Sequence, residues 1–239
     1  MRIHVLVEWE AYMHDTAPPG LEALKVVDAT TLLLYDVLVD NEAAADRGSA
    51  DGRRKMAIAH LSTIMLRTSR ACMHVISTGY VQEAVSLKRR ITEAAHHTEK
   101  VRIDASGEYA KQWLAGKASA SSRLARSVGQ SARQWDFYSH GAHADARILP
   151  TQPEGEQVVK VLLTPDRDQQ AANALLTELA IELADQVAIV ARELRGTELV
   201  GRERERLDEI NRHIELLEER WYLGVSEGLD EMARVRTEH

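Results

Sequence analysis

The sequence predicts an all-α protein, and three observations support this prediction. Only 13 glycines, 5 prolines and one phenylalanine occur among 239 residues, whereas Ala, Leu, Arg and Glu are abundant, so local preference favours helix. Apolar residues recur every three or four positions along most of the chain. The hydrophobic content of 44% can build a substantial core. We therefore expect a single domain over residues 1–239, an up-and-down helical bundle.

Charge and composition restrict the environment of the protein. The net charge of −7 argues against general binding of polyanions, although it is compatible with a local basic patch. The single cysteine, Cys72, cannot form an intrachain disulfide and lies among apolar residues, so we expect a buried thiol and a cytoplasmic location. No segment has the pattern of a secretion signal or the length of a membrane span, so we expect no membrane association.

The core bundle is expected over about residues 20–147. Residues 1–14 contain a short apolar run that we leave unassigned, and Pro18-Pro19-Gly20 interrupts it. The turn residues of 46–52 should separate the first two helices, which should lie antiparallel, and Gly79 should separate the second from the third. These three long helices are expected at residues 21–45, 53–78 and 80–104.

Two further helices should complete this core. The shorter one has Ser106 as a plausible N-cap and Glu108 in its first turn, and it should end near Gly116. The other begins after a serine-rich stretch, residues 119–122, and runs into Trp135. It therefore carries the motif with the densest chemistry in the chain.

Residues 148–165 should form an irregular connection, because they hold three of the five prolines. Val158–Leu163 is a β-type run, so we expect a minor β excursion near 156–164, as a hairpin or as a lone strand pairing with residues 3–7.

The C-terminal helices are expected over residues 166–239. The first should run from about Asp166 to Leu194 and end at Gly196. The second has an apolar seam that could pack on the bundle or on a second subunit, formed by Leu207, Ile210, Ile214, Leu217 and Trp221. The alternating charges of residues 202–206 should form a solvated face whose arginines and glutamates pair with one another.

The segment Arg133-Gln-Trp-Asp-Phe-Tyr-Ser-His-Gly-Ala-His-Ala-Asp145 is the main candidate site. If residues 131–143 form one helix, four side chains fall within roughly 80° of each other, namely those of Arg133, Asp136, His140 and His143. An imidazole can move a proton near neutral pH, and a guanidinium can hold a phosphate. We expect His140 or His143 to act as general acid/base and Arg133 to bind a scissile phosphate, which a metal-independent ribonuclease requires. If the helix ends at Gly141, His143 leaves this face.

Two resemblances bear on this segment. The spacing Arg133-x6-His140 resembles the Arg-x4–6-His pattern of the HEPN superfamily, which includes dimeric helical ribonucleases of toxin and phage-defence systems. Over about residues 60–145 the chain is also similar to uncharacterised bacterial helical proteins thought to be HEPN-like, with an Arg-x3-Glu helix and a later Tyr-x3-Ser-x3-His motif. Here Arg89 and Glu93 match the first motif, and Trp135, Ser139 and His143 match the second, with Trp135 in place of tyrosine. The resemblance implies a HEPN-like homodimer with an RNA substrate and no cofactor.

Two other interpretations remain open. Arg89, Glu93, Ser139 and Trp135 could form a structural polar network in a non-catalytic protein that binds an unknown partner protein. Alternatively, Glu93-x2-His96 is half of the motif found in di-metal carboxylate bundles. His140 and His143 could then supply further ligands for iron, manganese or zinc.

Overall fold

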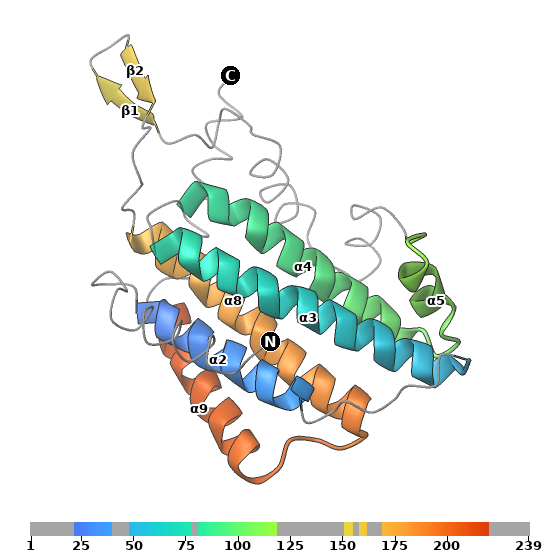
Figure 1. The fold of residues 1–239 in the computed structure, drawn as a ribbon. Coiled ribbons are helices and arrows are strands. Elements are labelled where there is room, and N and C mark those ends of the chain that lie inside the picture. The colour runs from blue at the N-terminus through green and yellow to red at the C-terminus, as the bar shows by residue number, and fades with distance from the viewer. Residues whose placement is uncertain are drawn as a thin grey trace.

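The computed structural model describes residues 22–39, 48–77, 81–118, 151–154, 158–161 and 169–219. Within these ranges six helices pack around one apolar core, which confirms the all-α class (Figure 1). The helices are α2 (Glu22–Val39), α3 (Ala50–Ser77), α4 (Val81–Ile103), α5 (Glu108–Leu114), α8 (Gln169–Val190) and α9 (Gly201–Leu217). None of these described helices is long and apolar enough to cross a membrane.

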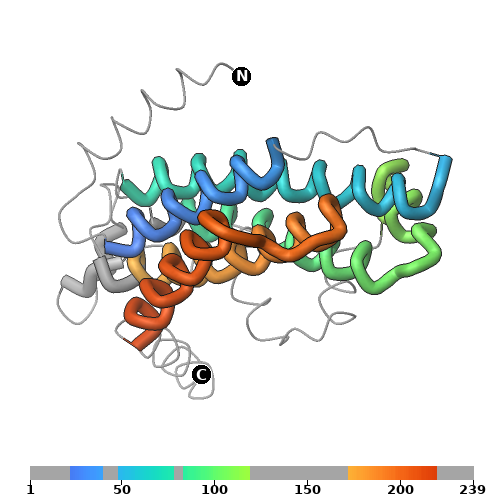
Figure 2. Tube along the Cα trace, turned by 90° about the horizontal axis from the view of Figure 1, so that it is seen from below, coloured from blue at the N-terminus to red at the C-terminus, as the bar shows by residue number. Residues whose placement is uncertain are grey.

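Chain direction alternates from α2 to α3 to α4 (Figures 1 and 2), and the antiparallel arrangement of the first two was predicted. Helix α8 runs in the same direction as α4. Arg54, in the first turns of α3, shows this because it contacts the C-terminal ends of both helices. It donates to Val101 O near the end of α4 at 3.3 Å, and to Glu193 Oε2 just after the end of α8 at 3.1 Å. Helix α8 packs against α2, α3, α4 and α9, and α3 packs against α2, α4, α5 and α8, so these two helices contact most of the other described helices.

Helix α3 begins earlier than the sequence predicted. Its first residue is Ala50, inside the range 46–52 that was expected to be a turn. Ser49 accounts for the difference, because its Oγ accepts a hydrogen bond from Gly52 N at 3.0 Å and so satisfies an N–H group of the first turn.

The start of α5 is also fixed by side chains that precede it. Ser106 Oγ accepts from Glu108 N at 3.2 Å, and Asp104 Oδ2 accepts from Tyr109 N at 2.7 Å. The N-cap position itself is occupied by Gly107 with φ +69°, so the prediction of Ser106 as N-cap was wrong by one residue. The helix ends just before Gly116, as predicted.

The segment that was expected to be an irregular connection, residues 148–165, contains a short antiparallel hairpin of strands β1 (Thr151–Glu154) and β2 (Val158–Val161). Thr151 pairs with Val161, and Glu154 pairs with Val158. The two strands pair with each other, and the helical core formed by the described residues contains no strand.

Helix α8 continues into a π-helical turn, η2 (Ala191–Arg195), and ends at Gly196 with φ +72° as predicted. The seam of α9 is buried within the chain, against α2 and α8, through Leu207, Ile210, Ile214 and Leu217. It therefore does not offer these four residues to a second subunit. Trp221 lies outside the described residues.

The charged run at the start of α9 was expected to be solvated and to pair within itself. Arg202, Arg204 and Glu205 are exposed as expected, but the pairing was wrong. Arg204 pairs with Asp208 at 3.0 Å, and Arg206 reaches Asp36 of α2 at 2.6 Å. Glu203 accepts both bonds of a bidentate pair from Arg195 in η2, the shorter at 2.6 Å. The pairs of Arg206 with Asp36 and of Glu203 with Arg195 connect α9 to α2 and η2, whereas the pair of Arg204 with Asp208 lies within α9.

Replacing Gly107 by alanine should destabilise the protein more than the same change at Gly116. Both glycines have positive φ, which costs an L-residue about 1–2 kcal/mol. Only at Gly107 would a Cβ also meet backbone, 2.9 Å from Ala50 O, which should cost about 1–3 kcal/mol more. Chemical denaturation of the two variants measures this difference, and equal losses would contradict it.

Candidate functional site

The predicted catalytic segment lies outside the described residues. This holds for Arg133, Asp136, His140 and His143, and also for Trp135 and Ser139 of the polar network. The shared helical face and the role of Gly141 therefore stay predictions.

Helix α4 carries the predicted site residues that the structure does describe. Glu93 is half-buried, and burial raises the pKa of its carboxyl while the charges of Arg89 and Arg90 lower it. His96 is buried one turn later. Among the described residues no three His, Cys, Asp or Glu side chains lie close enough to hold a metal ion, so the half-motif of Glu93 and His96 is not completed there.

A buried ammonium group forms the centre of a polar cluster between α4 and α8. Lys88 has no exposed surface. Its Nζ lies 2.8 Å from Glu182 Oε1 and 3.7 Å from Glu178 Oε2, and it donates to Thr92 Oγ1 at 3.1 Å. Thr92 in turn donates to Glu182 Oε1 at 2.7 Å. We call Lys88, Thr92, Glu178 and Glu182 the lysine cluster.

Helix α3 borders this cluster through Cys72. Its thiol is buried and donates to Ala84 O at 3.7 Å. Burial raises the pKa of Cys72 to about 12, with a lowering by Lys88 and a raising by Glu182. The prediction of a buried core thiol is confirmed. Burial therefore favours the protonated thiol, and Cys72 packs as a core side chain.

Two more buried polar contacts join α8 to its neighbours. Gln186 Nε2 donates to Ser62 Oγ of α3 at 2.7 Å. Asn173 Oδ1 accepts from Ala23 N at 3.0 Å and so satisfies an N–H group in the first turn of α2. With Glu182 bonded to α4, α8 thus carries three polar side chains that each bond to a different helix.

The chemistry open to the lysine cluster is limited by its enclosure. The ammonium of Lys88 cannot touch a substrate because none of it is exposed. The side chains of Glu178 and Glu182 keep exposed fractions of only 13% and 18%. This arrangement can hold α4 and α8 together.

A second group of polar rings lies where α4 meets α5. His97 Nδ1 and Tyr109 Oη lie 2.8 Å apart and share a hydrogen bond, and the two rings stack. Trp113 tilts against His97. Burial, followed by the charge of His96, lowers the pKa of His97 to about 4, and burial raises that of Tyr109 to about 12. Both rings are therefore neutral at physiological pH.

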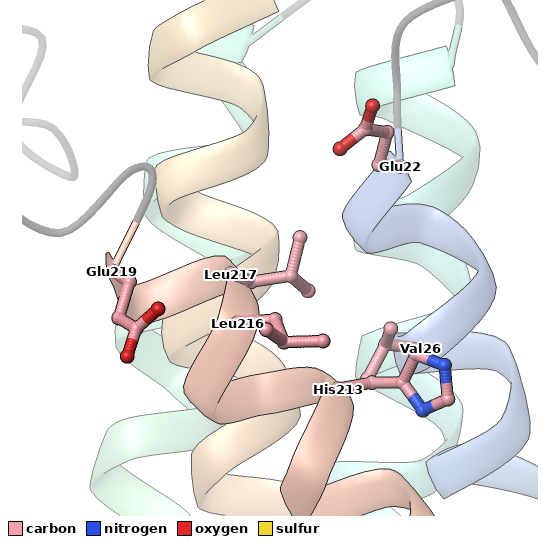
Figure 3. Close-up of a pocket in the computed structure, with 6 residues that line it drawn as sticks. All are labelled: Glu22, Val26, His213, Leu216, Leu217 and Glu219. Atoms are coloured by element: carbon pink, nitrogen blue, oxygen red, sulfur yellow. The ribbon is translucent and has the colours of Figure 1, made fainter.

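A groove runs between the start of α2 and the end of α9 (Figure 3). The groove contains two pockets, and the larger one has a volume of about 500 Å³. Val26 of α2 faces His213 and Leu216 of α9 across it, and the carboxylates of Glu22 and Glu219 lie at its rim. His213 Nδ1 is held 2.8 Å from Glu209 O of its own helix, so the ring contacts its own backbone.

Lys88 was not among the predicted site residues, although its position in the sequence signals burial. Lys88 lies three residues after Val85 and three before Ile91, so it occupies the apolar face of α4. Glu178 and Glu182 flank Leu179 on α8 with a spacing of four. A lysine on a buried face requires an acidic partner, and these two glutamates match that requirement.

The described helices define an all-α protein whose apolar core contains a few buried polar contacts. Comparisons of the chain with protein-family models, with curated proteins and with solved structures gave no match.

Removing the buried ammonium should destabilise the fold strongly. Lys88→Met leaves Glu182 buried without its cation, which should lower the free energy of unfolding by about 3–5 kcal/mol at neutral pH. Lys55→Met is the matched control, because Lys55 forms an exposed i, i+4 pair with Asp51 at 2.9 Å and should lose less than about 0.5 kcal/mol. Urea denaturation measures both, and similar losses would contradict the structural role of Lys88.

Acidification should destabilise the contact of α4 with α5 through His97. Its pKa falls from 6.5 to about 4 on folding, so its contribution is present above pH 6.5 and is lost as the pH falls from 6.5 towards 4. At neutral pH, the free energy of unfolding of His97→Phe should be about 1 kcal/mol lower than that of wild type. As the pH falls, His97→Phe should lose less stability than wild type does. Melting temperatures across this window test the difference, with Tyr109→Phe as the control that keeps the imidazole. Parallel acid destabilisation of wild type and His97→Phe would contradict the assignment.

Proposed function

We propose that this chain is a HEPN-like helical protein that cleaves RNA without a metal ion. The observation that carries the proposal is the spacing Arg133-x6-His140 within a segment that also contains Asp136 and His143. In this proposal Arg133 binds the scissile phosphate and His140 or His143 moves the proton, because a guanidinium and an imidazole suit these two roles.

The all-α architecture of the described residues supports this proposal, since the resemblance implies a helical bundle. The side chains of Lys88, Thr92 and Gln186 inside the described core bond to other core residues, so this core would act as a scaffold and residues 133–143 would carry the chemistry. We further propose a homodimer that acts in defence or stress, as the resemblance implies.

RNA cleavage by the purified protein in the presence of EDTA tests the proposal. Arg133→Ala and His140→Ala should each lower the cleavage rate by about 10²–10⁴-fold, because each removes one catalytic role. Arg202→Ala and His213→Ala are matched controls, because both side chains are exposed on α9, and they should cleave like wild type.

Two results would contradict the proposal. Unchanged cleavage by both Arg133→Ala and His140→Ala would exclude the assigned roles. Cleavage that EDTA abolishes and that a divalent metal restores would favour the di-metal alternative instead, with Glu93 and His96 as its first candidate ligands.

The second candidate is a non-catalytic helical protein that binds a partner protein. The lysine cluster favours it, because the cluster accounts for buried charge through structure alone. The RNA assay separates the two candidates, since a non-catalytic protein cleaves no faster than a buffer blank.

A further inference from the structure

Helix α3 lies in a long stretch of the chain that contains no acidic residue. No Asp or Glu occurs between Asp51 and Glu83, although the whole chain has a net charge of −7. Two cations of this stretch are paired, Arg54 with Glu193 and Lys55 with Asp51. The stretch contains five Lys or Arg residues in all, namely Arg53, Arg54, Lys55, Arg67 and Arg70. It is therefore positive within a negatively charged protein.

The outer side of α3 carries a straight line of cationic and imidazole side chains. Arg53, His60, Arg67 and His74 follow one another at intervals of seven residues, so they fall within roughly 60° of each other and about 10 Å apart along the helix. His60, Arg67 and His74 are exposed, and Arg53 is partly exposed. The opposite side of α3 packs in the core against α2, α4 and α8. We call these four residues the basic stripe.

The described residues do not neutralise the two guanidinium groups of the basic stripe. Arg53 donates to Gly48 O at 2.7 Å, and this acceptor is an uncharged carbonyl. Arg67 forms no ion pair within the described part of the chain, and its side chain is exposed. Both charges are therefore available to a negatively charged ligand.

The neighbouring helix α4 does not reverse the sign of this surface. It carries five Lys or Arg residues and three glutamates. The contact of Cys72 with Ala84 sets the register of the antiparallel pair, which places Arg89 and Arg90 level with Arg67. Arg90 is exposed, so α4 adds positive charge beside the basic stripe.

We propose that the basic stripe of α3 is a docking surface for the phosphate backbone of RNA. This inference rests on the proposed function, because it names the surface that holds the substrate. A guanidinium can donate two hydrogen bonds to one phosphate, and an imidazole N–H can donate one. A protein with a net charge of −7 requires a local positive surface to bind a polyanion, and the basic stripe supplies it.

An anionic membrane fits this surface less well than RNA does. A helix that lies on a membrane inserts an apolar face, whereas the apolar side of α3 is buried in the core. None of the large exposed apolar side chains in the described ranges belongs to α3. They are Val39, Ile103, Val200 and Leu216.

Fluorescence anisotropy with a labelled single-stranded RNA tests this docking surface in the full chain. The RNA carries 2′-O-methyl groups, which block attack by the neighbouring hydroxyl, so the probe stays intact. Arg67→Glu should weaken binding by about tenfold or more, because it replaces a phosphate donor by a repelling charge. Arg202→Glu is the matched control, because it makes the same change in net charge at an exposed arginine of α9. It should bind within about twofold of wild type.

The salt dependence of binding gives a second readout. Arg67→Ala should reduce the slope of log Kd against log salt concentration by about 0.7, the contribution of one phosphate contact to a single strand. Because Arg67 is exposed, the Arg67 variants should melt at the temperature of wild type.

The docking surface and the cleavage reaction can fail separately. If wild type cleaves RNA and Arg67→Glu changes neither affinity nor cleavage, the basic stripe is overturned and the proposed function stands. If RNA binds through Arg67 and is not cleaved, the proposed function is overturned and the basic stripe stands.

Three other results would overturn the basic stripe. The first is equal weakening by Arg67→Glu and Arg202→Glu, since that is an effect of net charge alone. The second is a wild-type protein that does not bind RNA. The third is binding to phosphatidylserine vesicles that Arg67→Glu abolishes while RNA affinity is unchanged.

Discussion

The bond between the Lys88 ammonium and the Glu182 carboxylate is the interaction on which the arrangement of the described helices most depends. An ammonium without any exposed surface loses its hydration, so hydrogen-bond acceptors of the protein must replace the lost water molecules. Thr92 and Glu182 provide them at 3.1 Å and 2.8 Å. A rotation of α8 by one residue, about 100°, would remove Glu182 from this position. The ion pair therefore specifies the register of α8 against α4.

The other polar residues of α8 extend this constraint to the rest of the bundle. Asn173 bonds to the first turn of α2 and Gln186 bonds to Ser62 of α3. Apolar packing alone permits many alternative rotations of a helix that is apolar on most sides, whereas three directional contacts at 173, 182 and 186 agree on one. These three contacts hold α8 in one orientation against α2, α3 and α4.

The sequence predicted the helical elements well, because apolar periodicity and glycine signals are local. The ends at Gly116 and Gly196 are examples, since each adopts positive φ. Predictions that depended on distant partners were wrong or missing. Arg206 pairs with Asp36, 170 residues away in sequence, and Lys88 finds its carboxylates on a helix that begins at Gln169. Tertiary packing decides which charged side chains form ion pairs, so residue spacing within one helix could not identify these partners.

A double-mutant cycle tests the central claim most directly, namely that Lys88 and Glu182 form a directly coupled buried pair. Free energies of unfolding are measured for wild type, Lys88→Met, Glu182→Gln and the double variant at neutral pH. The two changes should be strongly non-additive, with a coupling energy of about 1–3 kcal/mol, because each single change leaves the other group without its main partner. Additive losses, within about 0.5 kcal/mol, would show that the two side chains do not interact and would contradict this account.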